Sequence, residues 1–207
     1  GNMRHTNPPI TSLQRVSGNT FDMAPAPGPY TSGNGGGAIS FIGALTGTSI
    51  GTFSNVEITG NTINNVVAYR RGITIGNNAN SLANSPRGVI SNALIECNRI
   101  SGPGGGAQTG SVGIRLSGNV TAISVVGNDI AEVDTGFQGI ENINGVPSAV
   151  TVTGNAFRGT PVYGVDWRSV EVIDAELNWW DDASGPTVGT NPGGTGAAIG
   201  ASGGPVG

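Results

Sequence analysis

The sequence contains no lysine, one histidine and one cysteine among its 207 residues. All nine basic residues are arginines, they are scattered along the chain, and the formal net charge is −4. Nucleic acids and anionic membrane surfaces are recognised by clustered basic residues, so this distribution argues against either as a partner. The single cysteine, Cys97, cannot form a disulfide within the chain, and we interpret it as a small buried residue.

Long apolar runs are also missing. No apolar stretch reaches the roughly 18 residues of a membrane span, so we expect no membrane insertion. Charged residues make up only 11% of the chain, whereas glycine occurs 37 times. The composition does not shift along the chain, which favours a single domain over residues 1–207. Because the chain starts abruptly, without a signal peptide, we expect a processed chain or a piece of a larger protein.

A nine-residue pattern organises most of the sequence. Its clearest copy, residues 55–63, is Asn-Val-Glu-Ile-Thr-Gly-Asn-Thr-Ile. Similar copies lie at 92–100, 122–130 and 149–157, and a degraded copy lies at 15–21. We assign a last copy to the apolar residues Val170, Val172 and Leu177, with Ala175 in the place of the asparagine. The chain is therefore a repeat, and its fold follows from what one unit can form.

Each unit contains short strands separated by a corner. Alternating apolar residues indicate a strand with one buried face, and the Gly-Asn pair that follows tolerates the left-handed backbone of a tight turn. A second pattern, at 72–75, 113–116, 136–138 and 164–167, adds another strand to each unit. Such units stack most simply as a solenoid. We predict an all-β fold, a short right-handed parallel β-helix of about six coils. Residues 1–13 are its entry segment, 14–177 its coils and 178–207 its closing segment.

Asparagines recur at the predicted corners. Stacked one above another, their amides can form a hydrogen-bonded ladder, as stacked asparagines do in cross-β assemblies. Ligand binding is the alternative interpretation of these positions. The predicted structural ladder consists of Asn19, Asn61, Asn98, Asn128 and Asn155.

The sequence changes character near its C-terminus. Residues 174–186 contain Asp-Ala, then Asn-Trp-Trp, then Ser-Gly-Pro, and Asn-Pro-Gly-Gly-Thr-Gly follows at 191–196. This segment resembles the closing motif of secreted bacterial right-handed β-helix repeat proteins, in the broad pectin-lyase-like superfamily. The resemblance implies a secreted or cell-surface location. Asp181 stands where that family usually has glycine. We interpret Trp179 and Trp180 as a lid over the core of the last coil, with a sugar-stacking platform as the alternative.

A candidate site follows from the second strand of each unit. If the apolar residues there point inward, Thr74, Arg115, Gln138 and Asp166 point outward in one column. The resemblance implies enzymes that act on acidic polysaccharides from such a face. Hydrolysis needs two carboxylates about 5–10 Å apart. A lyase-type reaction needs a calcium cluster and a basic residue.

The column offers one carboxylate and one arginine, and the only histidine, His5, lies in the entry segment. Glu132 and Asp134 flank Val133 and could approach Asp129, but we interpret these acidic residues as solvated. We therefore expect no metal and no cofactor, with calcium as the remaining alternative.

These observations favour a non-catalytic extracellular module, structural or adhesive. It would belong to a larger surface protein or stack end to end with copies of itself. One alternative is a polysaccharide lyase, hydrolase or epimerase that uses Arg115, Asp166 and the loops 76–88 and 101–111 as a cleft. Another is a carbohydrate-binding module. The expected partners are polysaccharide or further copies of the chain.

Overall fold

The computed structural model describes residues 2–5, 11–23, 36–43, 45–46, 49–50, 52–76, 88–104, 108–142 and 145–201. Within these residues all regular secondary structure is β, and nearly all strand pairs are parallel. Three parallel sheets are built from strands that recur in the same order along the chain. The predicted fold class, an all-β parallel β-helix, is confirmed.

The three sheets are named A, B and C. Sheet A has the order β1 (Asn2–His5), β4 (Gly37–Gly43), β9 (Arg71–Gly76), β12 (Gln108–Ser117), β15 (Val133–Ile140), β18 (Tyr163–Arg168), β21 (Gly196–Ala201) and β20 (Pro186–Thr187). Sheet B has the order β19 (Ile173–Asp174), β16 (Ser148–Thr153), β13 (Val120–Val126), β10 (Ile90–Glu96), β7 (Phe53–Thr59) and β2 (Gln14–Ser17). Sheet C has the order β17 (Ala156–Arg158), β14 (Asp129–Ala131), β11 (Arg99–Ser101), β8 (Thr62–Asn64) and β3 (Thr20–Asp22). A small antiparallel hairpin joins β5 (Leu45–Thr46) to β6 (Ser49–Ile50).

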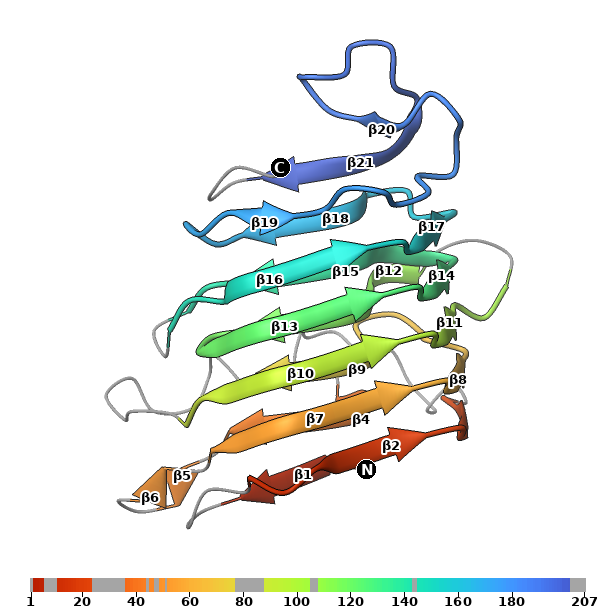
Figure 1. Ribbon diagram of the computed structural model, residues 1–207. Helices are drawn as coiled ribbons and strands as arrows, with labels where there is room; N and C mark the ends of the chain where they lie inside the picture. The colour runs from red at the N-terminus through yellow and green to blue at the C-terminus, as the bar shows by residue number, and fades with distance from the viewer. Residues whose placement is uncertain are drawn as a thin grey trace.

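The chain climbs as a right-handed coil. In Figure 1 the sheet B strands run to the right in front, and the sheet A strands run to the left behind them. The chain meanwhile rises from the N-terminus at the bottom to the C-terminus at the top. This is the handedness that parallel crossovers adopt. Residues dozens of positions apart thereby become neighbours on adjacent coils.

The core lies inside the coil and consists of stacked apolar columns. Along sheet B, Ile58 pairs in register with Ile95, Ile95 with Val125, and Val125 with Val152. All four side chains are fully buried. The alternation of apolar and polar residues therefore places one face of every strand in the core and the other outside.

The second sequence pattern, which forms the strands of sheet A, starts with glycine because a side chain at this position would collide with the next coil. A Cβ at Gly113 would lie 2.6 Å from the carbonyl oxygen of Gly136 and 2.6 Å from the side chain of Ile130. Gly72 and Gly136 have the same environment one coil away. The coils pack closely at this column, and glycine permits that approach.

The corner between sheets B and C uses the left-handed backbone conformation. Gly60 has a φ of 62° and Gly127 a φ of 61° at this corner. Cys97 occupies the same position with a φ of 53°, although it carries a side chain. Its thiol side chain is exposed, so the interpretation of Cys97 as a buried residue is wrong. A side chain at this position points out of the corner rather than into the core.

The last coil differs from the assignment made from the sequence. Ile173 pairs with Val150 and is buried, whereas Val170, Val172 and Leu177 are exposed. Asn178, rather than Ala175, takes the asparagine position, 23 residues after Asn155. Leu177, in the position of the corner glycine, has a φ of 58°. The copy lacks the Gly-Asn pair, which is why its register was misassigned.

The segments outside the predicted coils also add strands to sheet A. Residues 2–5, which we expected in an entry segment, form β1 and pair in parallel with β4. In the closing segment, β21 pairs in parallel with β18, and β20 pairs with β21. The sheet therefore continues into both segments.

Candidate functional site

The four residues predicted to share an outer column do so. Thr74 in β9 pairs in register with Arg115 in β12, Arg115 with Gln138 in β15, and Gln138 with Asp166 in β18. Neighbouring members are therefore about 4.8 Å apart along the coil axis. Although they face outward, Thr74, Gln138 and Asp166 are buried, and Arg115 is half-buried.

Asp166 is fully engaged in a network. Gln138 Nε2 donates to Asp166 Oδ2 at 2.8 Å, and Arg168 Nε donates to Asp166 Oδ1 at 3.0 Å. Arg168 also forms an ion pair with Asp166, in which its Nη2 lies 2.8 Å from Oδ2. The Asp166 side chain is only 4% exposed. This carboxylate is therefore a structural partner of Gln138 and Arg168.

Arg115 is in the opposite situation. Among the residues that the structure describes, none forms a hydrogen bond or an ion pair with its guanidinium. The pKa of Arg115 is lowered to about 10, chiefly by burial and also by the positive charges of Arg71 and Arg168. A half-buried cation near two other cations is unfavourable unless an anion joins it.

The neighbouring arginines have pKa values shifted by different causes. Burial lowers the pKa of Arg71. The pKa of Arg168 is raised, chiefly by its hydrogen bond to Asp166 and also by the charge of that carboxylate. Arg71 and Arg168 flank Arg115 from different strands, so the three cations form a basic cluster across sheet A.

Thr74 adds a second group without a partner. Its Oγ1 is buried and has no hydrogen-bond partner among the described residues. Thr74 is the in-register neighbour of Arg115, so the two residues lie on adjacent strands of sheet A. Hydroxyl and guanidinium groups donate hydrogen bonds to the oxygens of carboxylate and sulfate groups.

The asparagines at the corner form a continuous hydrogen-bonded column. Asn61 Nδ2 donates to Asn98 Oδ1 at 3.0 Å, and Asn98 Nδ2 donates to Asn128 Oδ1 at 2.9 Å. The same bond links Asn19 to Asn61, Asn128 to Asn155, and Asn155 to Asn178. Apart from the Asn19 oxygen at the N-terminal end of the column, these amides bond to each other and to the backbone, which supports the structural interpretation.

The two tryptophans of the closing segment have different environments. Trp180 is 6% exposed and packs its ring against Phe157 with a centroid distance of 5.4 Å. Trp179 is 47% exposed and continues sheet C beyond Ala156. Only Trp180 has the position expected of a lid over the core. Trp179 lies on the outer surface instead.

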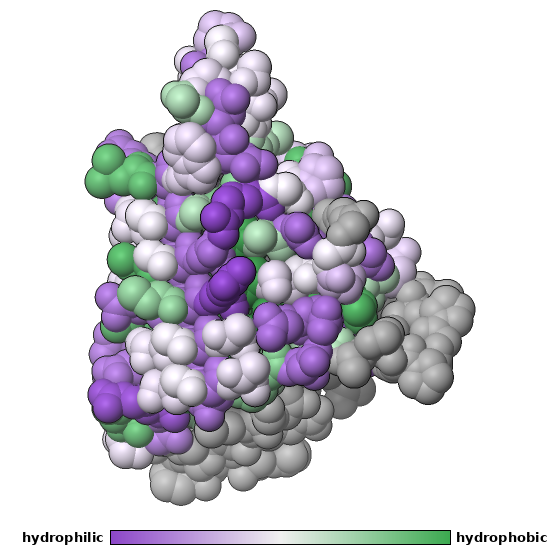
Figure 2. All heavy atoms as spheres, turned by 90° about the vertical axis from the view of Figure 1, so that its right-hand side faces the viewer, coloured by the Kyte–Doolittle hydropathy of each residue, from purple (hydrophilic) through white to green (hydrophobic). Residues whose placement is uncertain are grey.

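Two of the three acidic residues considered as a calcium site, Asp129 and Asp134, make other contacts. Asp129 forms an ion pair with Arg158, and the Asp134 carboxylate accepts a hydrogen bond from the Gly110 backbone. A shallow groove of about 430 Å³ crosses this part of sheet C. Figure 2 shows hydrophilic residues gathered down the middle of this side of the molecule. Within the described ranges, no three His, Cys, Asp or Glu side chains are grouped as metal ligands.

Several expectations fall outside the described residues. Most of the loop 76–88 and the centre of the loop 101–111, which we assigned to a polysaccharide cleft, are among them, as is the side chain of His5. In the part of the chain that is described, no helix has the length and apolarity of a membrane span.

No protein-family model, curated protein or solved structure that we compared with the chain matches it. The function therefore has to be argued from the site itself.

The sequence did not identify Arg71 and Arg168 as members of the site. They lie at different positions along their strands, β9 and β18, so no fixed spacing in the repeat connects them with Arg115.

Proposed function

We propose that this chain is a non-catalytic extracellular β-helix module whose sheet A face binds acidic polysaccharide. The observation that carries the proposal is the unpaired, half-buried guanidinium of Arg115 beside Arg71 and Arg168. A carboxylate or sulfate on a glycan would pair with this cation. The adhesive role and the secreted or cell-surface location are parts of the same proposal, and the resemblance of the closing motif supports them.

The chemistry of the described face favours binding over catalysis. Its column holds one carboxylate, Asp166, and that group is already bonded to Gln138 and Arg168. Hydrolysis of a glycosidic bond requires a pair of carboxylates in which one acts as acid. A bound anion would instead find fixed donors, with no group placed to remove or deliver a proton.

The experiment measures binding of the chain to polygalacturonate, alginate and neutral dextran by isothermal titration calorimetry. We expect saturable binding to the two uronate polymers and none to dextran. Arg115→Gln should weaken uronate binding about tenfold, the cost of one charge-assisted contact. The matched control is Arg15→Gln, which removes the same charge from sheet B, where Arg15 pairs with Glu57.

The Arg115→Gln variant also reports on its own folding. Removing an unpaired, half-buried cation should leave the free energy of unfolding unchanged or raise it by about 1 kcal/mol. Weaker binding in a variant of equal or greater stability would therefore locate the site. Equal binding by Arg115→Gln and wild type would reject it.

The alternative function is a polysaccharide lyase, hydrolase or epimerase. An assay of the same polymers for new reducing ends, unsaturated ends or epimerised residues distinguishes such an enzyme from a binding module. Our proposal expects none of these products. Product formation that is lost in Asp166→Ala or Arg115→Ala would establish the enzymatic alternative and overturn the non-catalytic one.

A second candidate role, end-to-end stacking of copies, is favoured by the ends of the asparagine ladder. Within the described residues, Oδ1 of Asn19 accepts no hydrogen bond, and β2 has one neighbour, β7, in sheet B. An open strand edge is a template for another strand. Light scattering over a range of concentrations tests this role, which predicts growing mass, whereas a constant monomer mass rules it out.

A further inference from the structure

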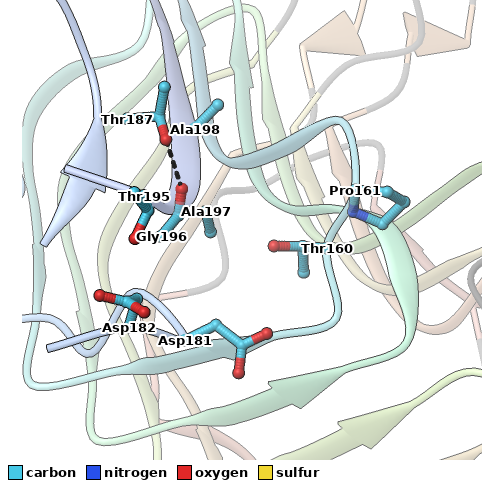
Figure 3. A pocket seen from close by; sticks show the side chains of 9 residues that line it. All are labelled: Thr160, Pro161, Asp181, Asp182, Thr187, Thr195, Gly196, Ala197 and Ala198. Atoms are coloured by element: carbon cyan, nitrogen blue, oxygen red, sulfur yellow. Dashed lines mark hydrogen bonds between the residues drawn. The ribbon is translucent and has the colours of Figure 1, made fainter. Parts of the chain in front are cut away.

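A polar pocket of about 360 Å³ lies at the C-terminal end of the coils. It is bounded by the turn between β17 and β18 and by the closing segment. Figure 3 shows Asp181 and Asp182 along one side of it, with Thr160 facing them and Thr195 near Asp182. Two carboxylates and three threonine hydroxyls, including that of Thr187, thus line one hollow, and the basic cluster of sheet A does not contribute to it.

Both carboxylates of the pocket accept hydrogen bonds from described residues nearby. Asp181 Oδ2 accepts a hydrogen bond from the backbone N–H of Gly159 at 2.9 Å. Asp182 Oδ1 accepts from the backbone N–H of Ser184 at 2.8 Å and from its hydroxyl at 2.6 Å. In the part of the chain that the structure describes, no arginine pairs with either residue. The pocket therefore carries two negative charges.

The Asp182 carboxylate is held in its charged form. The hydroxyl and the backbone N–H of Ser184 lower its pKa by hydrogen bonding to the ionised group. Ser184 Oγ also lies 3.0 Å from Thr195 Oγ1, so these side chains form one connected polar wall. Oxygen atoms of this kind are fixed before any ligand arrives, which lowers the entropic cost of binding.

Thr160 supplies an independent sign of a ligand. This residue is 5% exposed, and its Oγ1 has no hydrogen-bond partner among the described residues. Figure 3 shows this oxygen turned into the space that the aspartates enclose. A buried hydroxyl without a partner is costly, and such groups in native proteins commonly contact a water or an ion.

We propose that this pocket binds a calcium ion. Its potential ligands are all oxygens, from two carboxylates and from hydroxyls, and its charge is opposite to that of a hard divalent cation. Calcium accepts irregular oxygen shells completed by water, whereas magnesium requires near-octahedral geometry. Asp181, Asp182 and Thr195 belong to the closing segment, and Thr160 belongs to the preceding turn. The ion therefore joins the closing segment to the coils.

The test titrates calcium chloride into the full chain, stripped with EDTA, at constant ionic strength. We expect one site with a Kd on the order of 10⁻⁴ to 10⁻³ M, as in extracellular calcium modules. At about 10 mM calcium the Tm should rise by a few degrees. Magnesium should give a smaller rise. Asp181→Asn and Asp182→Asn should each weaken calcium binding about tenfold, because ligand charge sets the affinity.

Two further variants distinguish calcium binding in this pocket from a general effect of charge or stability. Asp174→Asn removes the same charge from an exposed residue of β19 outside the pocket, and it should bind calcium like wild type. Thr160→Val keeps the shape and removes the unpaired hydroxyl. In EDTA its Tm should equal or exceed that of wild type, while its calcium affinity falls. The proposal is overturned if wild type binds no calcium, or if the pocket variants keep the wild-type response.

Discussion

At the scale of single residues, the corner asparagines satisfy backbone groups that the turn would otherwise leave unpaired. Asn98 Oδ1 accepts from both the backbone N–H and the side-chain amide of Asn61, each at 3.0 Å. Its Nδ2 donates to the carbonyl of Ile58 in the coil before it, at 2.8 Å. Asn98 Nδ2 also donates to Asn128 Oδ1 in the following coil at 2.9 Å. This side chain, which is 1% exposed, therefore links three consecutive coils.

Replacing Asn98 by alanine should lower the free energy of unfolding by ~2–4 kcal/mol, because the buried N–H of Asn61 and the Ile58 carbonyl lose their partners. Urea denaturation measures the change. Asn64→Ala is the matched control, since Asn64 lies in β8 outside the ladder. Its cost should stay below ~0.5 kcal/mol. Equal losses in the two variants would show that the ladder does not stabilise the coils.

At Cys97 we predict a substitution that raises the free energy of unfolding. It holds a φ of 53° at a corner where neighbouring coils place Gly60 and Gly127. A side chain in this conformation costs roughly 1 kcal/mol, and glycine avoids that cost. Cys97→Gly should therefore raise the unfolding free energy by ~0.5–1 kcal/mol in the same urea assay. A loss of stability would mean that the thiol makes a contact worth more than the backbone strain.

At the scale of elements, the closing segment covers the core through one of its two tryptophans. Trp180 packs against Phe157, so the last open layer of apolar side chains is shielded from water. Its neighbour Trp179 donates its backbone N–H to the Asn155 carbonyl at 2.7 Å and leaves its ring half exposed. Consecutive residues of an extended segment point to opposite sides, which is why the pair cannot act together as a lid.

Thermal unfolding can separate the two tryptophans. Trp180→Ala should cost ~3–5 kcal/mol, the usual loss for a buried large aromatic side chain. Trp179→Ala should cost less than ~1 kcal/mol, since its ring keeps much of its exposure to water in the folded state. Comparable losses would indicate that both rings cover the core.

The elements that could be predicted from the sequence are those with a strong repeat. Val56, Ile58 and Ile63 mark strand and corner by their spacing alone, and their counterparts on later coils stack in register. The last coil was misassigned because Leu177 replaces the corner glycine, so the asparagine of Asn178 had no Gly-Asn signature. Strand β1 could not be predicted from the sequence, because its four residues, Asn-Met-Arg-His, show no alternation of apolar and polar side chains.

At the scale of the whole molecule, the coil brings together charges that no local pattern connects. The outer column of sheet A follows from strand alternation, and the sequence was sufficient to place Thr74, Arg115, Gln138 and Asp166 on it. The basic cluster also depends on where Arg71 and Arg168 fall across the sheet, and the pocket at Thr160 depends on how the closing segment folds back. Neither has a periodic signal, so both required coordinates.

The most direct test of the account is amide hydrogen exchange with and without polygalacturonate, read by mass spectrometry at low and high salt. We predict slower exchange in β9, β12, β15 and β18 of sheet A, and a smaller effect at high salt because the contact is electrostatic. Sheets B and C should be unchanged. Protection confined to sheet B or sheet C, or no protection at any salt concentration, would contradict the assignment of ligand binding to the Arg115 face.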